Sequence, residues 1–236
     1  MALILNIETA TTVCSVSLAK DGSLLALKEI NGDYTHSENL TLFIQDVCLQ
    51  ADIKLADVDA IAVSKGPGSY TGLRIGVSTA KGLCYSLNKP LIAINTLQHL
   101  ALSVSEKFRS HPEYDKKTSG PTLFCPMIDA RRMEVYCAVY DSSNKEIIPT
   151  AAEIIDEHSF ADLLRSNQVV FFGDGAAKCK DLLSTNTHAL FMEDVILSAT
   201  NMLALSEEAF ANGKFEDVAY FEPFYLKDFM IGKMNK

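Results

Sequence analysis

The hydrophobic residues of the chain form short apolar runs that alternate with longer segments of helical periodicity. The first half opens with three extended runs, and the second and third of these meet at Asp21-Gly22, a pair typical of a tight hairpin turn. Two further apolar runs each lead into a segment with apolar residues at helical spacing. In the first half we therefore expect strands at 3–7, 13–18, 24–30, 60–64 and 91–95, and helices at 35–51, from the loop after 64 to just before Pro90, and at 96–108.

A polar stretch at 109–120 divides the chain, and the same order of elements then returns. The expected elements are strands at 123–128, 134–140 and 145–148, a helix at 159–165, and a buried strand at 169–172 that runs into Gly173-Asp174-Gly175. Residue identity between the halves is slight, so the repeat is one of pattern. We expect an α/β protein with duplicated lobes, each a mixed sheet flanked by helices. The expected division is a first lobe at 1–108, a linker at 109–120, and a second lobe at 121–197 plus 213–236, with a helix at 198–212 that returns to the first lobe.

Composition and charge narrow the class of protein. With 236 residues, of which 48% are hydrophobic, the chain can bury a substantial core. Its formal charge of −9 argues against strong direct nucleic-acid binding, because phosphate binding depends on Lys and Arg. The six cysteines are scattered without a Cys-x-x-Cys pair, which is typical of reduced core residues. The chain has no apolar run long enough to cross a membrane, and Met1 to Ile7 is typical of a strand and not of a signal peptide, so we expect a cytoplasmic protein.

The loop after the strand at 60–64 is the most distinctive segment of the chain. It runs from Gly66 to Gly76, and it opens a helix whose N-terminus favours an anion. It lacks the Gly-Lys-Ser/Thr ending of a Walker loop. Small residues then recur every four positions, which lets another helix approach closely; they are Gly72, Gly76, Ala80 and Cys84. Three interpretations stay open: an interface with a partner chain, helix packing within the lobe, and an anion site.

Charged residues and histidines offer few candidates for chemistry. Asp129, Arg131 and Arg132 form a charged turn, for which we expect a structural or docking role because no nucleophile accompanies them. The five histidines show no metal-ligand spacing, and we expect them to be solvated or to cap helices; they are His36, His99, His111, His158 and His188. We therefore expect no metal site.

Four motifs carry a resemblance that covers nearly the whole chain. They lie at 5–11, 66–76, 128–136 and 173–175. With these motifs the chain resembles the bacterial TsaB (YeaZ) family, within the superfamily of actin, sugar kinases and Hsp70-like ATPases. The resemblance implies actin-like, ribonuclease H-like lobes. It also implies a role in making threonylcarbamoyladenosine in tRNA.

The resemblance further implies that this chain lacks the chemistry of its relative TsaD. That enzyme binds its catalytic metal through a His-x-x-x-His pair after the fifth strand, where this chain has Thr96 and Leu100. The resemblance therefore implies a non-catalytic regulatory subunit that binds and activates TsaD, helps to recruit the ATPase TsaE, and pairs with itself when alone. A metal-dependent glycoprotease-like hydrolase and a sugar-kinase-like ATP-binding enzyme stay open as alternatives.

Two sets of site residues follow from this resemblance. Active members of the superfamily hold nucleotide phosphate and magnesium with an Asp-x-Gly loop, and Ala10 stands in place of that glycine here, so an ordinary turn is the competing interpretation. The candidate nucleotide-binding residues are Glu8, Thr9, Thr11, Gly173 and Gly175. The candidate partner-interface residues are Leu40, Phe43, Ile44, Val47, Gly72, Leu73, Arg74, Ile75, Gly76, Thr79 and Ala80. No cofactor is expected, while ATP or ADP at an interface shared with a partner stays open.

Overall fold

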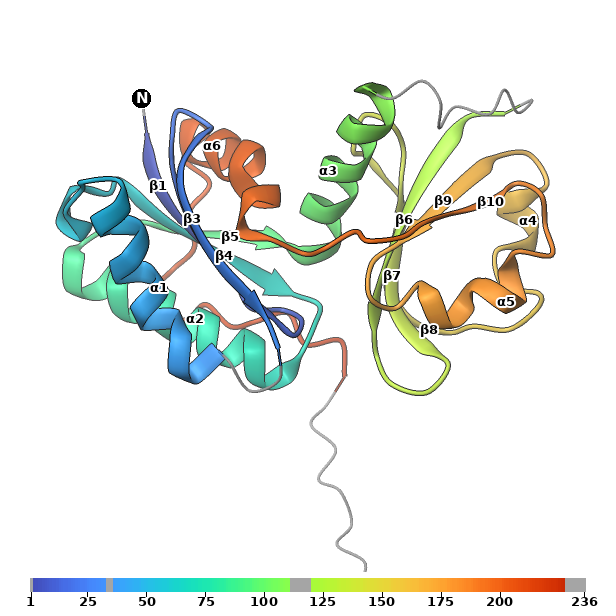
Figure 1. Ribbon diagram of the computed structural model, residues 1–236, viewed down its shortest axis with the longest axis horizontal. Helices are drawn as coiled ribbons and strands as arrows, with labels where there is room; N and C mark the ends of the chain where they lie inside the picture. Colours follow the sequence, from blue (N-terminus) through green and yellow to red (C-terminus); the bar gives the residue numbers. More distant parts are fainter. Residues whose placement is uncertain (1, 33–35, 111–119, 228–236) are drawn as a thin grey trace, which may run out of the picture.

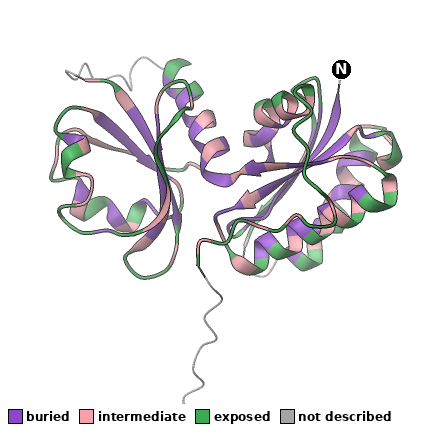
Figure 2. Ribbon diagram, turned by 180° about the vertical axis from the view of Figure 1, so that it is seen from behind, coloured by how far each residue is buried: buried purple, intermediate pink, exposed green. Residues whose placement is uncertain are grey.

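Two similar lobes stand side by side, each built on a five-stranded mixed sheet (Figure 1). The structure is a computed structural model that describes residues 2–32, 36–110 and 120–227. Most of the expected linker, at 111–119, lies outside the described residues, as do residues 33–35 and 228–236. Figure 2 shows that the strands of both sheets are largely buried, while the outer faces of the helices are exposed.

The first sheet has the strand order β3-β2-β1-β4-β5. Its strands are β1 (Leu3–Glu8), β2 (Val13–Lys20), β3 (Ser23–Asn31), β4 (Ala60–Gly66) and β5 (Leu91–Asn95). The strands β1, β2 and β3 are antiparallel, and β4 and β5 run parallel to β1. The expected hairpin is present, because Asp21 and Gly22 both have positive φ, as a tight hairpin turn requires.

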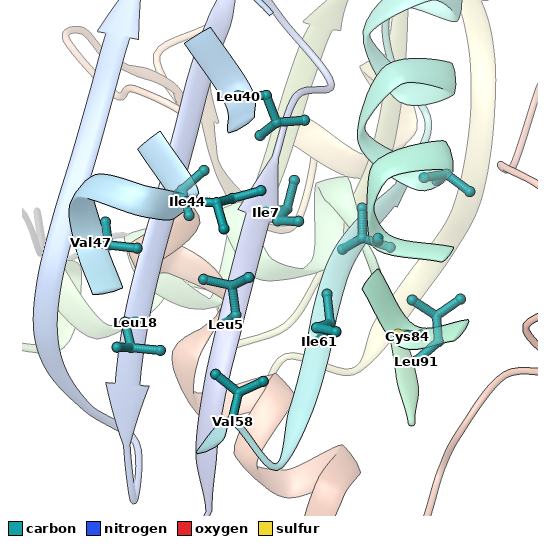
Figure 3. Packing of buried hydrophobic residues seen from close by; sticks show 14 of the residues in the cluster. Leu5, Ile7, Leu18, Leu40, Ile44, Val47, Val58, Ile61, Cys84 and Leu91 are labelled. Carbon is teal, nitrogen blue, oxygen red and sulfur yellow. The ribbon is translucent and has the colours of Figure 1, made fainter. Parts of the chain in front are cut away.

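Two long helices cover one face of this sheet. They are α1 (His36–Gln50) and α2 (Tyr70–Leu87), and a short 3₁₀ turn, η1 (Leu55–Asp57), precedes β4. Residues of β1 alternate between the two faces of the sheet, so Leu5 and Ile7 pack under these helices. Figure 3 shows Leu40, Ile44 and Val47 of α1 pointing into the same cluster.

The second sheet has the order β10-β9-β6-β7-β8, which corresponds strand for strand to the first. Its strands are β6 (Thr122–Asp129), β7 (Glu134–Tyr140), β8 (Glu146–Ile154), β9 (Gln168–Phe172) and β10 (Ala189–Met192). Short helices join them: α4 (Ala161–Leu164), η3 (Ala177–Cys179) and α5 (Lys180–Leu183). The duplicated actin-like fold expected from the sequence is confirmed by this order and by solved structures described below.

The helix α3 (Thr96–Ser110) joins the lobes. It follows β5, yet it packs on β6 and β7 of the second sheet. Its residues Leu97, Leu100 and Val104 share one apolar cluster with Phe124 and Phe172 of the second lobe. The expected first lobe at 1–108 is therefore not separate from the second, because the apolar face of its last helix completes the second core.

The chain returns to the first lobe after β10. A 3₁₀ turn, η4 (Ala199–Met202), and the helix α6 (Leu203–Ala211) cover the second face of the first sheet, where Met202 is buried beside Ile4. The expectation that 213–236 joins the second lobe is wrong for most of its described part. Val218 and Phe221 pack against the core of the first lobe, and Glu216 pairs with Leu91 of β5. No helix among the described residues is long and apolar enough to cross a membrane.

Candidate functional site

A carboxylate lies at the carboxyl end of β1, fully buried between the first sheet and α3. The Glu8 Oε1 atom accepts hydrogen bonds from the backbone N–H of Ala10, at 2.6 Å, and from the Ser64 hydroxyl, at 2.7 Å. Its Oε2 atom lies 2.7 Å from Nε2 of His99, and both side chains are 0% exposed. A buried carboxylate is tolerated only when its oxygens are hydrogen-bonded. Both carboxylate oxygens of Glu8 are therefore bound by groups of the protein itself.

Its neighbours in the predicted nucleotide loop also point inward. The Thr9 hydroxyl donates to the carbonyl of Gly72 at 2.8 Å, and Thr9 is completely buried. The Thr11 hydroxyl accepts from the backbone N–H of Val13 at 3.3 Å. The side chains of Glu8, Thr9 and Thr11 thus hold their own turn and its neighbours together.

The loop that begins at Gly66 packs against this turn. Gly66 has a φ of +108°, a backbone conformation that residues with a side chain rarely adopt. A Cβ added at Gly68 would lie only 2.7 Å from the Cβ of Ala10. The backbone N–H of Ser69 donates to the carbonyl of Ala10 at 2.7 Å. The Ser69 side chain in turn caps α2 by accepting from the N–H of Gly72. This loop therefore makes a close connection between β4 and α2.

The stripe of small residues on α2 serves the same contact. A Cβ added at Gly72 would overlap the carbonyl oxygen of Thr9, and one added at Gly76 would overlap its hydroxyl. The sequence left open a partner interface, helix packing within the lobe, and an anion site. Gly72 and Gly76 pack within the lobe, but they contact the turn at Thr9 and not another helix.

Most of the predicted partner-interface residues lie in the core of the first lobe. Leu40, Ile44, Val47, Leu73 and Ala80 are buried at 3% exposure or less, and Gly72 and Gly76 are buried as well. Their prediction as a surface is wrong for the isolated chain, because apolar residues at helical spacing mark the face of a helix that covers its own sheet. Phe43, Ile75 and Thr79 are half-buried, and only Arg74 of the set is exposed.

The exposed apolar side chains of these helices lie at other positions. Leu42 and Leu49 on α1 and Tyr85 on α2 are 53%, 82% and 85% exposed. Leu42 and Leu49 are seven residues apart, so they lie on the same side of α1. These apolar residues stand outside the helical spacing of the buried residues. They are the signal in the sequence that would have identified the outer face of α1 and α2.

The second lobe repeats the glycine loop after its fourth strand. Gly173 directly follows β9 and has a φ of +99°, close to that of Gly66. A Cβ added at Gly175 would lie 2.8 Å from the carbonyl carbon of Ile128. Asp174, between the two glycines, accepts from the backbone N–H of Asp129 at 3.0 Å. Desolvation by the surrounding loop raises the pKa of Asp174, although the residue is exposed at the surface.

A small cavity of about 80 Å³ lies between the lobes. Of the predicted nucleotide-binding residues it brings together Thr11 and Gly173, while Glu8, Thr9 and Gly175 do not line it. Its walls also include Thr12, Asn31, Leu100, Ile128, Asp174 and the segment 195–197. Ligand pockets usually measure about 300–1,000 Å³, so a nucleotide does not fit this cavity as it stands.

The charged turn between β6 and β7 is held in an uncommon conformation. Arg131 and Arg132 are exposed and have φ values of 69° and 51°, where residues other than glycine are uncommon. Asp129, at the end of β6, forms an ion pair with Lys178 and accepts from the backbone N–H of Arg131 at 3.2 Å. The contacts of Asp129 thus hold the backbone of this turn, and the two arginine side chains lie exposed on it.

The general expectation for the histidines is wrong for two of them. His99 is bound to Glu8, and His36 is 8% exposed at the start of α1, beside the turn at 11–13. Desolvation lowers the pKa of His36, which favours its neutral form. His158 is exposed, Nδ1 of His188 contacts the carbonyl of Leu164 at 2.8 Å, and His111 lies outside the described residues. Within the described ranges, no three His, Cys, Asp or Glu residues are grouped to hold a metal ion.

Comparison with known proteins places the chain among proteins of tRNA threonylcarbamoyladenosine biosynthesis. The sequence model of the TsaD family, described as tRNA N6-adenosine threonylcarbamoyltransferase, matches residues 32–229. The tRNA threonylcarbamoyladenosine biosynthesis protein TsaB of Escherichia coli (strain K12) is 33% identical over 231 residues, or 95% of this chain and 94% of that protein. The TsaB protein of Bacillus subtilis (strain 168) is 28% identical over 82% of this chain and 76% of its own length.

Solved structures share the fold. A crystal structure from Pseudomonas aeruginosa, described as similar to the peptidase YeaZ, has a TM-score of 0.76 at 24% identity and covers 96% of this chain and 100% of that one. A structure of YeaZ from the same organism has a TM-score of 0.72 with the same coverage. The chain belongs to the TsaD family and, within it, to the TsaB proteins of tRNA threonylcarbamoyladenosine biosynthesis.

Proposed function

We propose that this chain is a non-catalytic subunit of the machinery that makes threonylcarbamoyladenosine in tRNA, and that it binds and activates a TsaD-type transferase. The observation that carries this proposal is the closed state of Glu8. Its two oxygens are bound by Ala10, Ser64 and His99, and the side chain has no exposed surface. An acidic group that served a nucleotide or magnesium would need an oxygen open to that ligand.

The surroundings of this site support the same conclusion. Thr96 and Leu100 occupy the places of the metal-binding histidines implied by the resemblance, and both are buried. His99, the histidine between them, has its Nε2 atom committed to Glu8. An enzyme of the hydrolase or kinase class would need an accessible ligand or nucleophile here, and these side chains offer none.

The outer face of α1 and α2 is the docking surface that we propose for the transferase. The two helices lie next to each other on one face of the first sheet (Figure 1). Leu42, Leu49 and Tyr85 point away from the core. Burial of such apolar surface favours association, and tyrosine is enriched among the residues that supply most of the binding energy at interfaces. The same face would hold a second copy of the chain when the transferase is absent.

The test of docking uses two surface variants and one matched control. Leu49→Asp and Tyr85→Asp should each weaken binding to a TsaD-type transferase at least about tenfold by calorimetry, because a charge would be buried at the interface. Ile154→Asp changes an equally apolar side chain, 73% exposed on β8 of the other lobe, and should leave the affinity unchanged. Unchanged binding by both helix variants would contradict the docking surface.

The test of a non-catalytic role is reconstitution from purified components. We expect the chain alone to transfer no threonylcarbamoyl group to tRNA, and to increase transfer when it is added to a TsaD-type transferase. A TsaE-type ATPase should join the pair but bind this chain alone weakly. Transfer by the isolated chain would overturn the assignment of this subunit as non-catalytic, whatever the outcome for the docking surface.

A further inference from the structure

The described end of the chain, residues 214–227, forms an extended strap along the first lobe. The backbone N–H of Glu216 donates to the carbonyl of Leu91 at 2.9 Å, which pairs the strap with the free edge of β5. Beyond this point Val218 and Phe221 pack against the first core. The Lys81 ammonium of α2 then donates to the carbonyls of Ala219, at 3.3 Å, and Phe221, at 2.8 Å. The strap is thus fixed to both β5 and α2.

The strap next crosses the glycine loop that follows β4. The backbone N–H of Phe224 donates to the carbonyl of Lys65 at 2.7 Å. A Cβ on Gly66 would lie 2.7 Å from the carbonyl oxygen of Phe224, so the missing side chain at Gly66 leaves room for this crossing. The ring of Tyr225 lies against Tyr70 at the start of α2, with 4.7 Å between the ring centroids.

The last described residue of the strap reaches the second lobe. The Lys227 ammonium forms an ion pair with Glu134 at the start of β7, and it lies 5.9 Å from the centroid of the Tyr136 ring. Glu134 is partly buried and Lys227 is exposed, so solvent and salt screen this ion pair in part. Within two residues, the strap therefore contacts α2 of the first lobe and β7 of the second.

This contact lies away from the other connections between the lobes. The helix α3 packs the lobes together at one end, and the segment that leads from β10 to η4 crosses near the middle. In Figure 1 the strap passes below both of these, at the opposite end of the gap between the lobes from α3. A single packed helix leaves a hinge free to rotate, whereas a second attachment at a distance from it opposes that rotation.

We propose that residues 214–227 act as a clasp that fixes the angle between the two lobes. Tyr225 on Tyr70 and Lys227 on Glu134 are its two fastenings. When the clasp is closed, Thr11 and Gly173 face each other across the small cavity between the lobes. When it is released, the lobes rotate about α3 and that cavity widens.

The test measures the distance between the lobes in the full-length chain. Spin labels at Gln50→Cys and Glu153→Cys, both exposed and on different lobes, report this distance by electron double resonance. The double variant Tyr225→Ala with Lys227→Met should broaden and lengthen the distance distribution, and the Phe224 amide should exchange with solvent at least about tenfold faster. Tyr220→Ala removes a strap side chain that is 84% exposed and should change neither quantity.

A charge exchange separates the clasp from a general loss of stability. Lys227→Glu alone should lengthen the distance between the labels, because it places two carboxylates together, and Lys227→Glu combined with Glu134→Lys should restore the parent distribution. The proposal is overturned if the double variant that lacks both fastenings keeps the parent distribution. It is also overturned if the charge exchange fails to restore the distance while circular dichroism shows a folded chain.

Discussion

The carboxyl ends of β1 and β6 occupy the same place in the two lobes, and each ends in an acidic residue. Glu8 ends β1 with no exposed surface and bonds to Ser64 and His99. Asp129 ends β6 with about half of its side chain in solvent and pairs with Lys178. The same strand order thus carries a buried carboxylate in one lobe and a solvated one in the other.

The difference shows how a duplicated fold can bury the carboxylate at the end of one strand and leave the equivalent carboxylate exposed to solvent. Both oxygens of Glu8 have hydrogen-bond partners, which come from the turn after β1, from β4 and from α3. Glycines at 68, 72 and 76 then let the loop and α2 approach the turn. In the second lobe, short helices replace α2, and Asp129 and the two arginines after it stay at the surface.

The two glycine loops provide the strongest test of this difference. Gly68→Ala should lower the free energy of unfolding by about 3 kcal/mol, because its Cβ would meet the backbone and the Cβ of Ala10. Gly175→Ala should cost about half as much, since its closest contact is longer, at 2.8 Å. Urea unfolding of both variants measures the difference, and an equal loss would show that the two loops are packed alike.

A third glycine variant controls for the residue type itself. Gly82 lies on the exposed side of α2 and has no atom within 4 Å of an added Cβ. Gly82→Ala should raise the free energy of unfolding by about 0.5–1 kcal/mol, because alanine favours a helix.

Neutral replacements of the two carboxylates come next in expected size. Glu8→Gln should cost about 2 kcal/mol, because its amide group cannot accept from Ala10, Ser64 and His99 in the same arrangement. Asp129→Asn should cost about 0.5 kcal/mol, as expected for a half-exposed ion pair. Both values follow from denaturant unfolding at neutral pH. If Asp129→Asn cost as much as Glu8→Gln, burial would not be what distinguishes the two ends.

The smallest expected effect is a pH dependence of the first lobe. Burial lowers the pKa of His36 below its ordinary value, so the folded chain binds this proton less readily than the unfolded chain. Its contribution to stability is complete above about pH 6.5 and is lost as the pH falls through the lowered pKa. His36→Asn should therefore flatten the loss of stability between about pH 7 and pH 5 in thermal unfolding. The exposed His158→Asn should leave the slope unchanged, and a slope unaffected by His36→Asn would contradict the assignment.

The sequence predicted the strands well where the pattern was local. Apolar runs located β1, β4, β5 and β9, and Asp21-Gly22 located the first hairpin. The strand β8 was expected to end at 148, before Pro149, but it continues to Ile154. Proline is tolerated there because β8 lies at the edge of its sheet and needs no donor on its outer side. The short edge strand β10 was missed, because four half-buried residues carry no periodic signal.

The contents of the candidate site depended on contacts between distant segments. His99 is 91 residues from Glu8 in the sequence, and no spacing rule joins them. The stripe on α2 was recognised as a close-packing surface, but its partner, Thr9, became visible only in three dimensions. Leu40, Ile44 and Val47 were assigned to a surface because periodicity marks an apolar face without saying what covers it.

The return of the chain to the first lobe has a consequence for synthesis at the ribosome. Residues 199–227 complete both faces of the first sheet, through Met202 on one side and Phe221 on the other. The segment 120–197 contains every strand of the second sheet and leaves the ribosome earlier. The lobe that is synthesised first is therefore the lobe that is completed last, and a nascent chain stopped before residue 199 exposes the unfinished face around Ile4 and Ile92.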